Sequence, residues 1–290
     1  MTVPPVPPGV LGAAPADRTL VMGVINVTPD SFSDGGVYAD PREASGAGVD
    51  MIAAGADLID VGGESTRPGA ARVSPQEELR RILPVVSELA AAGALVSVDT
   101  SRAAVAAAAL DAGACLVNDV TGGSDPEMFS MVAERKVPYV LMHGRGPSLD
   151  MQTRAGYTDV VAEVCDELHQ RMTSALEAGI SGDALILDPG IGFAKNGRHN
   201  WALLASLDRL HQLGRPLLVG TSRKSFLGHL LADAAGHPRA VDRRDAATVA
   251  TTALAAEHGA WGVRVHAVRA NVDAVRVAAQ WRQVREGLDG

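Results

Sequence analysis

Short runs of apolar residues recur along the chain and are separated by longer, partly polar segments. Parallel strands that are buried on both faces have continuous apolar runs instead of alternating polar and apolar residues. The runs are Leu20–Val24, Leu58–Val61, Leu95–Val98, Cys115–Val117, Tyr139–Met142, Leu185–Leu187, Leu217–Val219 and Gly262–Val265. They predict eight parallel strands.

The segments between these runs have the length and apolar spacing of helices. They are Arg42–Ala54, Pro75–Ala92, Arg102–Asp111, Pro126–Arg135, Asp159–Ala178, Asn200–Leu213, Arg244–His258 and Val272–Arg285. Gly55, Gly93 and Gly113 come just before the next strand, where glycine suits the left-handed stop of a helix. Eight strand–helix units predict a single-domain, eight-stranded parallel β/α (TIM) barrel.

A doubly wound open sheet is the main alternative fold. It usually has fewer strands and a GxGxxG fingerprint after the first one, which is absent here. We expect residues 1–18 to be a Pro-rich disordered lead-in, residues 19–286 to form the barrel, and residues 287–290 to be a tail.

Composition narrows the kinds of protein that this chain can be. A net charge of −8 argues against nucleic-acid binding through overall charge, although it allows a local pocket for a small anion. No apolar run approaches the roughly 20 residues that span a bilayer, and the first residues lack the features of a signal peptide. We therefore expect a cytoplasmic protein without a membrane partner. Cys115 and Cys165 are predicted to be free thiols.

Polar residues cluster directly after the predicted strands, whereas the opposite strand ends have no such cluster. In a barrel the functional groups lie at the carboxyl ends of the strands, so this asymmetry favours an enzyme over a structural protein. The structural alternative is that these residues form ordinary turns. The strand-end residues include Asn26, Asp60, Asp99, Asn118, His143, Asp188, Lys224 and His266.

Asp99, Asn118 and Asp188 follow the third, fourth and sixth strands, so a barrel would bring them to one spot. Carboxylates and a carboxamide suit a heterocycle edge that alternates donors and acceptors, such as a 2-amino-pyrimidinone ring. Capping of nearby helices is the structural alternative. A metal site made by Asp60, Asp99 and Asp188 is a second possibility, but no His or Glu stands at ligand spacing beside them.

Arg67, Lys224, Arg264 and His266 would bring positive charge to the same barrel mouth, where an anionic group could bind. Arg264 and His266 alternate along one strand and therefore share a side. The segment from Gly220 to Ser225 lacks the spacing of a phosphate loop, and no GxSxG motif is present. His143 also ends a strand, but we interpret this lone histidine as a structural residue.

Seven motifs together resemble the dihydropteroate synthases of folate biosynthesis, and they extend over nearly the whole chain after the Pro-rich start. They are GVINVTPDSFSDGG (Gly23–Gly36), DVGGESTRPGA (Asp60–Ala70), VDT (Val98–Thr100), VND (Val117–Asp119), DPGIGFAKN (Asp188–Asn196), GTSRKSFLG (Gly220–Gly228) and RVH (Arg264–His266). The resemblance implies a β/α barrel, usually a homodimer. It also implies a magnesium-dependent transferase that joins 6-hydroxymethyl-7,8-dihydropterin pyrophosphate to p-aminobenzoate and is a target of sulfonamides.

The resemblance also implies roles for individual residues. Asp99, Asn118, Asp188 and Lys224 match the pterin pocket, and Asn26 matches the residue that holds magnesium. Arg264 and His266 match the diphosphate anchors, and Asp34 and Phe32 lie on a first loop that closes over the substrates. The expected catalytic residues are Asp34, Asp99, Lys224, Arg264 and His266. The residues matching the p-aminobenzoate side are Thr66, Arg67, Pro68, Phe193 and Ser225.

One position departs from the family's pattern. An acid commonly follows the histidine of the last motif, and this chain has Ala267 there. Such an acid could orient the imidazole, so its loss puts fine tuning of activity in doubt. Two other readings are a pterin-binding paralogue without synthase activity and a methyltetrahydrofolate-dependent methyltransferase, and a non-enzymatic scaffold is the remaining class. The segments SRKSF and GGESTRPG favour the synthase.

Overall fold

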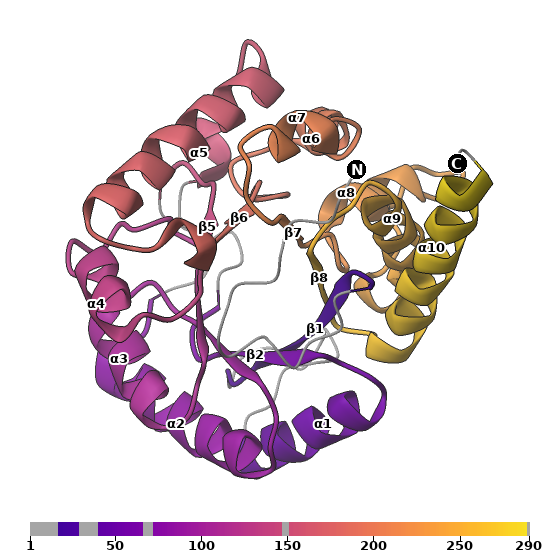
Figure 1. Cartoon of the computed structure of the whole chain (residues 1–290). Coiled ribbons are helices and arrows are strands. Elements are labelled where there is room, and N and C mark those ends of the chain that lie inside the picture. The colour runs from indigo at the N-terminus through magenta and orange to yellow at the C-terminus, as the bar shows by residue number, and fades with distance from the viewer. Residues whose placement is uncertain (1–16, 29–39, 66–71, 147–150, 289–290) are drawn as a thin grey trace.

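Eight parallel strands form a nearly closed barrel with helices around its outside (Figure 1). The computed structural model describes residues 17–28, 40–65, 72–146 and 151–288. The strand order is β6-β5-β4-β3-β2-β1-β8-β7, and a parallel bridge between Leu187 and Leu217 links β6 to the segment that enters β7. The predicted TIM barrel is therefore confirmed, and the open doubly wound sheet is excluded.

All eight apolar runs form strands. The strands are β1 (Leu20–Asn26), β2 (Leu58–Gly62), β3 (Val96–Asp99), β4 (Leu116–Asp119), β5 (Tyr139–Met142), β6 (Leu185–Asp188), β7 (Leu218–Val219) and β8 (Gly262–Val265). Several strands extend one or two residues beyond the apolar run. They therefore end on a polar side chain, as at Asn26, Asp99 and Asp188.

The helices follow the predicted segments with two differences. They are α1 (Pro41–Ala53), α2 (Pro75–Ala91), α3 (Ala103–Asp111), α4 (Met128–Arg135), α5 (Val160–Glu177), α6 (Gly197–Leu204), α7 (Leu207–His211), α8 (Ser225–Leu230), α9 (Asp245–Glu257) and α10 (Val268–Leu288). The predicted helix Asn200–Leu213 is in fact two helices, and α8 was not predicted. None of the helices in the described segments is long and apolar enough to cross a bilayer.

Glycine ends the first three helices as predicted. Gly55, Gly93 and Gly113 have φ angles of 100°, 83° and 110°. An L-residue with a side chain is strained there, so these glycines let the chain turn sharply back into the next strand.

The apolar core has two shells, which arise from the alternation of side chains along each strand. Val21 and Ile25 point outward and pack under the helices, whereas Leu20 and Met22 point into the barrel. The inner shell consists of Leu20, Met22, Leu58, Leu116, Val140, Ile186, Leu218 and Trp261. This apolar plug fills the amino-terminal part of the barrel, as the layered packing of such barrels requires.

The strand register places polar side chains above that plug. Asp60 is opposite Ser97, and Asp99 is opposite Asn118. Asp60 and Leu58 stand two residues apart on β2, so both face the barrel interior, with Asp60 nearer the carboxyl end. The alternating pattern thus directs several polar groups toward one end of the barrel.

Candidate active site

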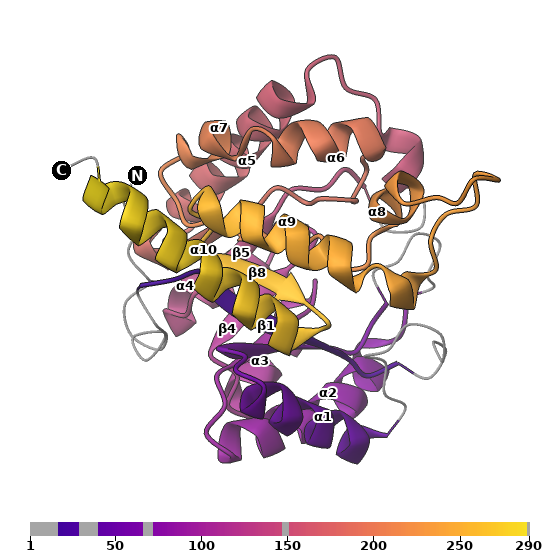
Figure 2. The ribbon, with the colours of Figure 1, turned by 90° about the vertical axis from the view of Figure 1, so that its right-hand side faces the viewer.

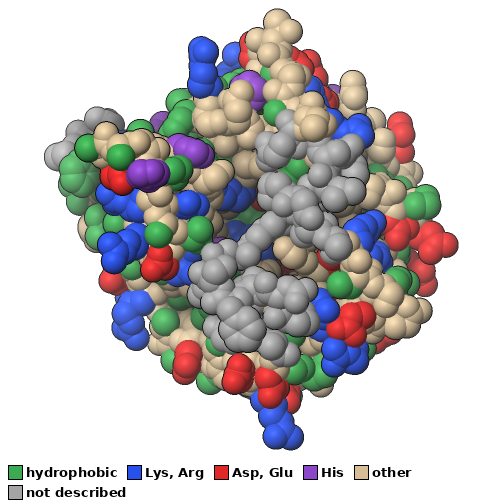
Figure 3. Space-filling view, turned by 180° about the vertical axis from the view of Figure 1, so that it is seen from behind, with side chains coloured by type: hydrophobic (Ala, Val, Ile, Leu, Met, Phe, Trp, Pro, Cys, Tyr) green, Lys and Arg blue, Asp and Glu red, His purple; other side chains and the backbone are tan. Residues whose placement is uncertain are grey.

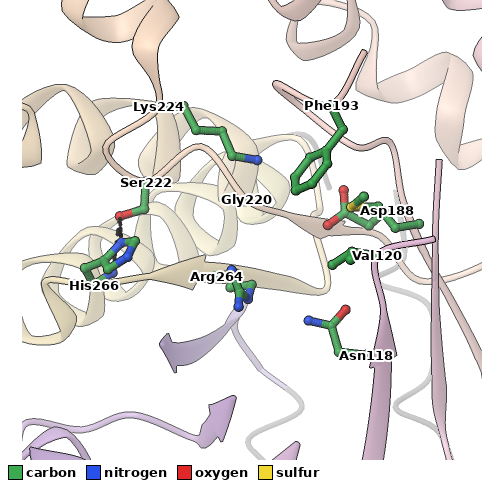
Figure 4. A pocket seen from close by; sticks show the side chains of 10 residues that line it. Asn118, Val120, Asp188, Phe193, Gly220, Ser222, Lys224, Arg264 and His266 are labelled. Atoms are coloured by element: carbon green, nitrogen blue, oxygen red, sulfur yellow. Dashed lines mark hydrogen bonds between the residues drawn. The ribbon is translucent and has the colours of Figure 1, made fainter. Parts of the chain in front are cut away.

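A pocket opens where the carboxyl ends of the strands meet (Figure 4). The pocket is partly open to solvent. Its lining residues are Asn118, Val120, Met142, Asp188, Phe193, Gly220, Ser222, Lys224, Arg264 and His266. Six of the predicted site residues are therefore brought together, although β4, β6 and β8 lie far apart in sequence.

Arg264 is held between two buried carboxylates. Its Nε donates to Asp60 at 2.6 Å and its Nη2 donates to Asp99 at 2.8 Å. Asp60 is fully buried and also accepts hydrogen bonds from Ser97 at 2.6 Å and Asn118 at 3.0 Å. Asp60 thus connects four strands and fixes both Arg264 and Asn118.

The charges of this group are unbalanced, because one guanidinium faces two acids. Burial raises the pKa of Asp99 to about 8, although Arg264 opposes the shift. Burial disfavours the charge of Arg264, but Asp60 and Asp99 raise its pKa above the usual value. Arg264 therefore stays charged, while Asp99 is able to hold or release a proton near neutral pH.

Asp188 and Lys224 form the other side of the pocket. Asp188 Oδ1 accepts a hydrogen bond of 2.7 Å from the backbone N–H of Gly190, and Lys224 Nζ donates to the carbonyl of Ile191. The Lys224 ammonium also lies 5.0 Å from the centre of the Phe193 ring. Burial lowers the pKa of Lys224 to about 8 and raises that of Asp188. The pocket thus presents an acceptor, a cationic donor and the Asn118 amide to a bound ring.

Ser222 holds His266 in place. The hydroxyl of Ser222 lies 2.9 Å from Nδ1 of His266 and also accepts a hydrogen bond of 3.2 Å from the His266 backbone N–H. This contact joins the loop after β7 to the end of β8 (Figure 4). The orientation that an acid at position 267 could supply therefore comes here from a serine on the loop after β7.

The loop that carries Ser222 and Lys224 is itself anchored by α9. Arg223 has a left-handed backbone, with φ of 59°, and forms an ion pair of 2.8 Å with Asp245. Its N–H donates to Thr248, and Thr221 shares a hydrogen bond of 2.7 Å with Thr251. Because a non-glycine residue is costly in this conformation, these contacts stabilise a strained turn beside the pocket.

The face of the molecule opposite to the view of Figure 1 is hollowed near its centre, and Lys and Arg side chains gather beside the hollow (Figure 3). This local positive charge contrasts with the net charge of −8 of the chain. An anionic substrate can therefore be attracted locally.

Other predicted site residues are less closely connected to the pocket. Ser225 is exposed at the first position of α8 and is not among the lining residues. Phe32, Asp34 and the segment from Thr66 to Pro68 lie outside the described residues.

Asn26 ends β1 opposite Gly62. Its Oδ1 is 3.6 Å from the position that a Cβ on Gly62 would occupy, so the amide oxygen lies close above the neighbouring strand. Among the described residues no three acidic, His or Cys side chains are grouped to hold a metal, which disfavours the site of Asp60, Asp99 and Asp188. One amide oxygen suits Mg²⁺ when substrate phosphates and water supply the other ligands. The residues present therefore fit a metal that binds together with a phosphorylated substrate.

Two parts of the site were missed by sequence reasoning. Asp60 was named among the polar residues near strand ends, but the only specific role considered for it was that of a metal ligand; Lys195 was not singled out. A charged residue within an otherwise apolar strand was the signal for Asp60. Lys195 is 3% exposed and contacts His143, whose structural interpretation agrees with its complete burial.

Comparison with known proteins agrees with this geometry. Residues 22–266 match the family described as pterin binding enzyme. The dihydropteroate synthase of Mycobacterium leprae is 56% identical over 263 residues, which cover 90% of this chain and 93% of that protein.

Solved structures agree as well. The Yersinia pestis dihydropteroate synthase, in a sulfonamide drug complex, has a TM-score of 0.86 and 44% identity, and the match covers 92% of this chain and 95% of that one. The Xanthomonas albilineans enzyme in complex with 7,8-dihydropteroate has a TM-score of 0.79 and 43% identity, with 93% and 94% covered. Because these matches extend over almost the whole barrel and include the residues of the pocket, the chain belongs to the dihydropteroate synthase family of pterin binding enzymes.

Proposed function

We propose that this protein condenses 6-hydroxymethyl-7,8-dihydropterin pyrophosphate with p-aminobenzoate, giving 7,8-dihydropteroate and pyrophosphate in folate biosynthesis. The observation that carries the proposal is the common pocket of Asn118, Asp188, Lys224 and Arg264. The bound 7,8-dihydropteroate in the Xanthomonas albilineans relative supports the same product here.

The pocket has the polar groups that a dihydropterin ring needs. The carboxylate of Asp188 accepts hydrogen bonds from the 2-amino and ring N–H groups, while Lys224 and the Asn118 amide donate to ring acceptors. A fixed, half-buried arrangement strengthens these contacts because water competes with them less. Asp99 is not among the lining residues, but it accepts a hydrogen bond of 2.8 Å from Arg264, which is one of them, and it carries a proton or a charge depending on pH.

The chain's residues assist departure of pyrophosphate by placing positive charge near it. Arg264 and His266 line the same pocket and stabilise the leaving anion. Asn26 and the substrate phosphates would hold magnesium, which would supply further positive charge for the departing anion. The electron-rich dihydropterin spreads the positive charge that develops on its methylene, and Asp99 stabilises it.

The aniline nitrogen of p-aminobenzoate then attacks the methylene, and no covalent enzyme intermediate is needed. Phe193 borders this side of the pocket. The further roles of Asp34, Thr66, Arg67, Pro68 and Ser225 rest on the matching motifs. Because the Yersinia pestis relative has a sulfonamide complex, we expect sulfonamides to compete with p-aminobenzoate here.

We further propose that the protein is a cytoplasmic homodimer. Four of the eight exposed large hydrophobic side chains among the described residues lie on α9 and α10, namely Leu254, Val277, Trp281 and Val284. These two helices pack side by side on the outside of the barrel (Figure 2). An apolar surface of this kind is typical of a subunit interface.

The decisive experiment mixes the purified protein with the dihydropterin pyrophosphate and magnesium and measures pyrophosphate release with and without p-aminobenzoate. Dihydropteroate should form, and Lys224→Ala should weaken both pterin binding and turnover about tenfold or more, because a charged donor leaves a buried pocket. The exposed Lys136→Ala is the control and should behave like the wild type.

Three outcomes would contradict the proposal. Pterin binding without dihydropteroate would indicate a non-catalytic paralogue. Methyl transfer from methyltetrahydrofolate to a corrinoid protein would indicate a methyltransferase. Unchanged kinetics in Lys224→Ala would remove Lys224 from the site.

A further inference from the structure

A group of buried ionisable side chains lies behind the pocket and takes no direct part in the proposed reaction. Lys195 belongs to the loop between β6 and α6, and His143 follows β5. Lys195 is 3% exposed and His143 is completely buried. Two half-buried residues, Glu167 on α5 and Arg145, complete the group: Glu167 contacts Nε2 of His143 and forms an ion pair with Arg145.

All three N–H groups of the Lys195 ammonium have an acceptor. Nζ lies 2.8 Å from His143 Nδ1, 3.1 Å from the Gly190 carbonyl and 3.0 Å from the Phe193 carbonyl. An ammonium has three donors and no acceptor, so this environment matches the charged form. These contacts favour the charged form, whereas burial favours the neutral form and lowers the pKa of Lys195 to about 7.

The contacts of His143 define its tautomer. Nδ1 accepts from Lys195, and Nε2 lies 3.0 Å from the carboxylate of Glu167, to which it donates. Burial lowers the pKa of His143 to about 4, so the ring is neutral and its proton is on Nε2. Glu167 therefore orients the His143 ring, and the ring in turn orients Lys195.

The loop that Lys195 holds has a costly backbone conformation. Gly190, Gly192 and Ala194 have φ angles of 65°, 83° and 50°. A Cβ on Gly190 would lie 1.8 Å from the His143 carbonyl oxygen, and Ala194 is completely buried. Such conformations persist only where surrounding contacts hold them. The bonds from Lys195 to the carbonyls of Gly190 and Phe193 are contacts of this kind.

The same loop shapes one wall of the pocket. Its Ile191 carbonyl accepts a hydrogen bond from Lys224, and its Phe193 ring lies 5.0 Å from the Lys224 ammonium. Its Gly190 N–H donates to Asp188 at 2.7 Å. Two residues of the predicted pterin pocket thus depend on the geometry of this loop.

We propose that Lys195 is a positioning residue of the active site: its ammonium fixes the Gly190–Phe193 loop, which orients Lys224 and Asp188 toward the pterin. His143 and Glu167 orient Lys195 in turn. The inference rests on the proposed function and adds a residue that contacts no substrate itself.

The test compares Lys195→Met with Arg18→Met in the full-length protein. Arg18 is a matched control because it also donates to a backbone carbonyl, that of Thr19, but at the opposite end of the barrel. Calorimetry with unreactive 6-hydroxymethylpterin measures binding, and initial rates give kcat and the KM for p-aminobenzoate. We expect Lys195→Met to weaken pterin binding about tenfold and to lower kcat, while Arg18→Met lowers only the melting temperature. The KM for p-aminobenzoate should also rise in Lys195→Met, because Phe193 on the same loop borders that substrate, and should change little in Arg18→Met.

A spectroscopic signature distinguishes positioning from a loss of stability. ¹⁵N NMR of His143 should show the Nε2–H tautomer in both proteins, because Glu167 still accepts from Nε2, but the Nδ1 resonance should shift downfield in Lys195→Met, because the donor to Nδ1 is lost. If Lys195→Met does not fold, His143→Phe serves instead. It keeps the ring shape, removes one of the three acceptors, and should weaken pterin binding about threefold.

Pterin binding and kcat equal to those of Arg18→Met, in either variant, would overturn the inference. A wild-type protein that forms no dihydropteroate would contradict the proposed function instead. The two failures are therefore distinguishable.

Discussion

At the scale of single residues, the site is built around an uneven set of charges. Arg264 donates to both Asp60 and Asp99, so the buried group has one positive charge for two carboxyl groups. Desolvation makes the second negative charge unfavourable, and it is Asp99 whose pKa rises, to about 8. A bound pterin with a positively charged methylene would restore the balance. The charge imbalance therefore destabilises the ligand-free protein, but it gives a site that suits the reacting substrate.

This imbalance predicts the pH dependence of stability. The pKa of Asp99 is about 8 in the folded state against 3.8 for the ordinary group, so between these values the folded state binds more protons than the unfolded state. The contribution of Asp99 to the free energy of unfolding should therefore fall as pH rises from 5 to 8, by at most about 1.4 kcal/mol per pH unit. Buried His143 and Lys195, whose pKa values are lowered, contribute in the opposite direction. In urea unfolding of the ligand-free protein, the slope of the wild type minus that of Asp99→Asn should therefore be negative.

Asp111→Asn is the control for that measurement. Asp111 is exposed, and Arg135 lowers its pKa, so it titrates below the range measured. A slope that is the same in Asp99→Asn and in the wild type would show that Asp99 is ionised throughout this range.

At the scale of elements, the apolar pattern was sufficient for the strands and for most helices. It failed where the same pattern is compatible with two structures. Leu203, Leu207 and Leu210 keep helical spacing across the break between α6 and α7, and the break at Ser206 is a change of backbone angles alone. Helix α8 has only six residues, which is too short for apolar periodicity to be read.

The candidate site was predictable where a motif or a strand end marks it. Asp188 and Lys224 were found in that way, and the pocket contains both. The contacts between elements were not predictable, because partners such as Lys195 and His143 are 52 residues apart and depend on the three-dimensional packing of two loops. Likewise, Ala267 alone suggested a poorly oriented imidazole, whereas Ser222 holds the ring from the loop after β7.

Ser222, on the loop after β7, is predicted to orient the His266 imidazole at the end of β8. Ser222→Ala removes the hydroxyl beside His266 Nδ1, so the imidazole can rotate away from the leaving group. We expect kcat/KM for the pterin pyrophosphate to fall about tenfold with little change in melting temperature. Steady-state kinetics of Ser222→Ala and Ala267→Asp would check this. A large gain in turnover in Ala267→Asp would contradict it, because it would mean that Ser222 orients the ring poorly.

At the scale of the whole molecule, the barrel separates two tasks. Its interior is closed by the apolar plug and carries the polar pocket at one end. On its outer face, four of the eight exposed large apolar side chains of the described residues lie on α9 and α10, namely Leu254, Val277, Trp281 and Val284. Helix α9 also anchors the loop of Lys224 through Asp245 and Thr248. A partner that covers α9 would therefore also support the pocket.

The proposed homodimer can be tested through the most exposed of these side chains. Trp281 is 69% exposed on α10, and large aromatic residues often dominate the energy of an interface. Trp281→Glu should weaken self-association about thirtyfold in sedimentation equilibrium, because a charge would be buried in an apolar contact. Leu176→Glu, on α5 at the other side of the barrel, is the control and should remain dimeric (Figure 1). If the dimer stabilises the α9-anchored loop, the affinity of Trp281→Glu for pterin should rise with protein concentration. A constant affinity would show that dimer formation does not affect the pocket.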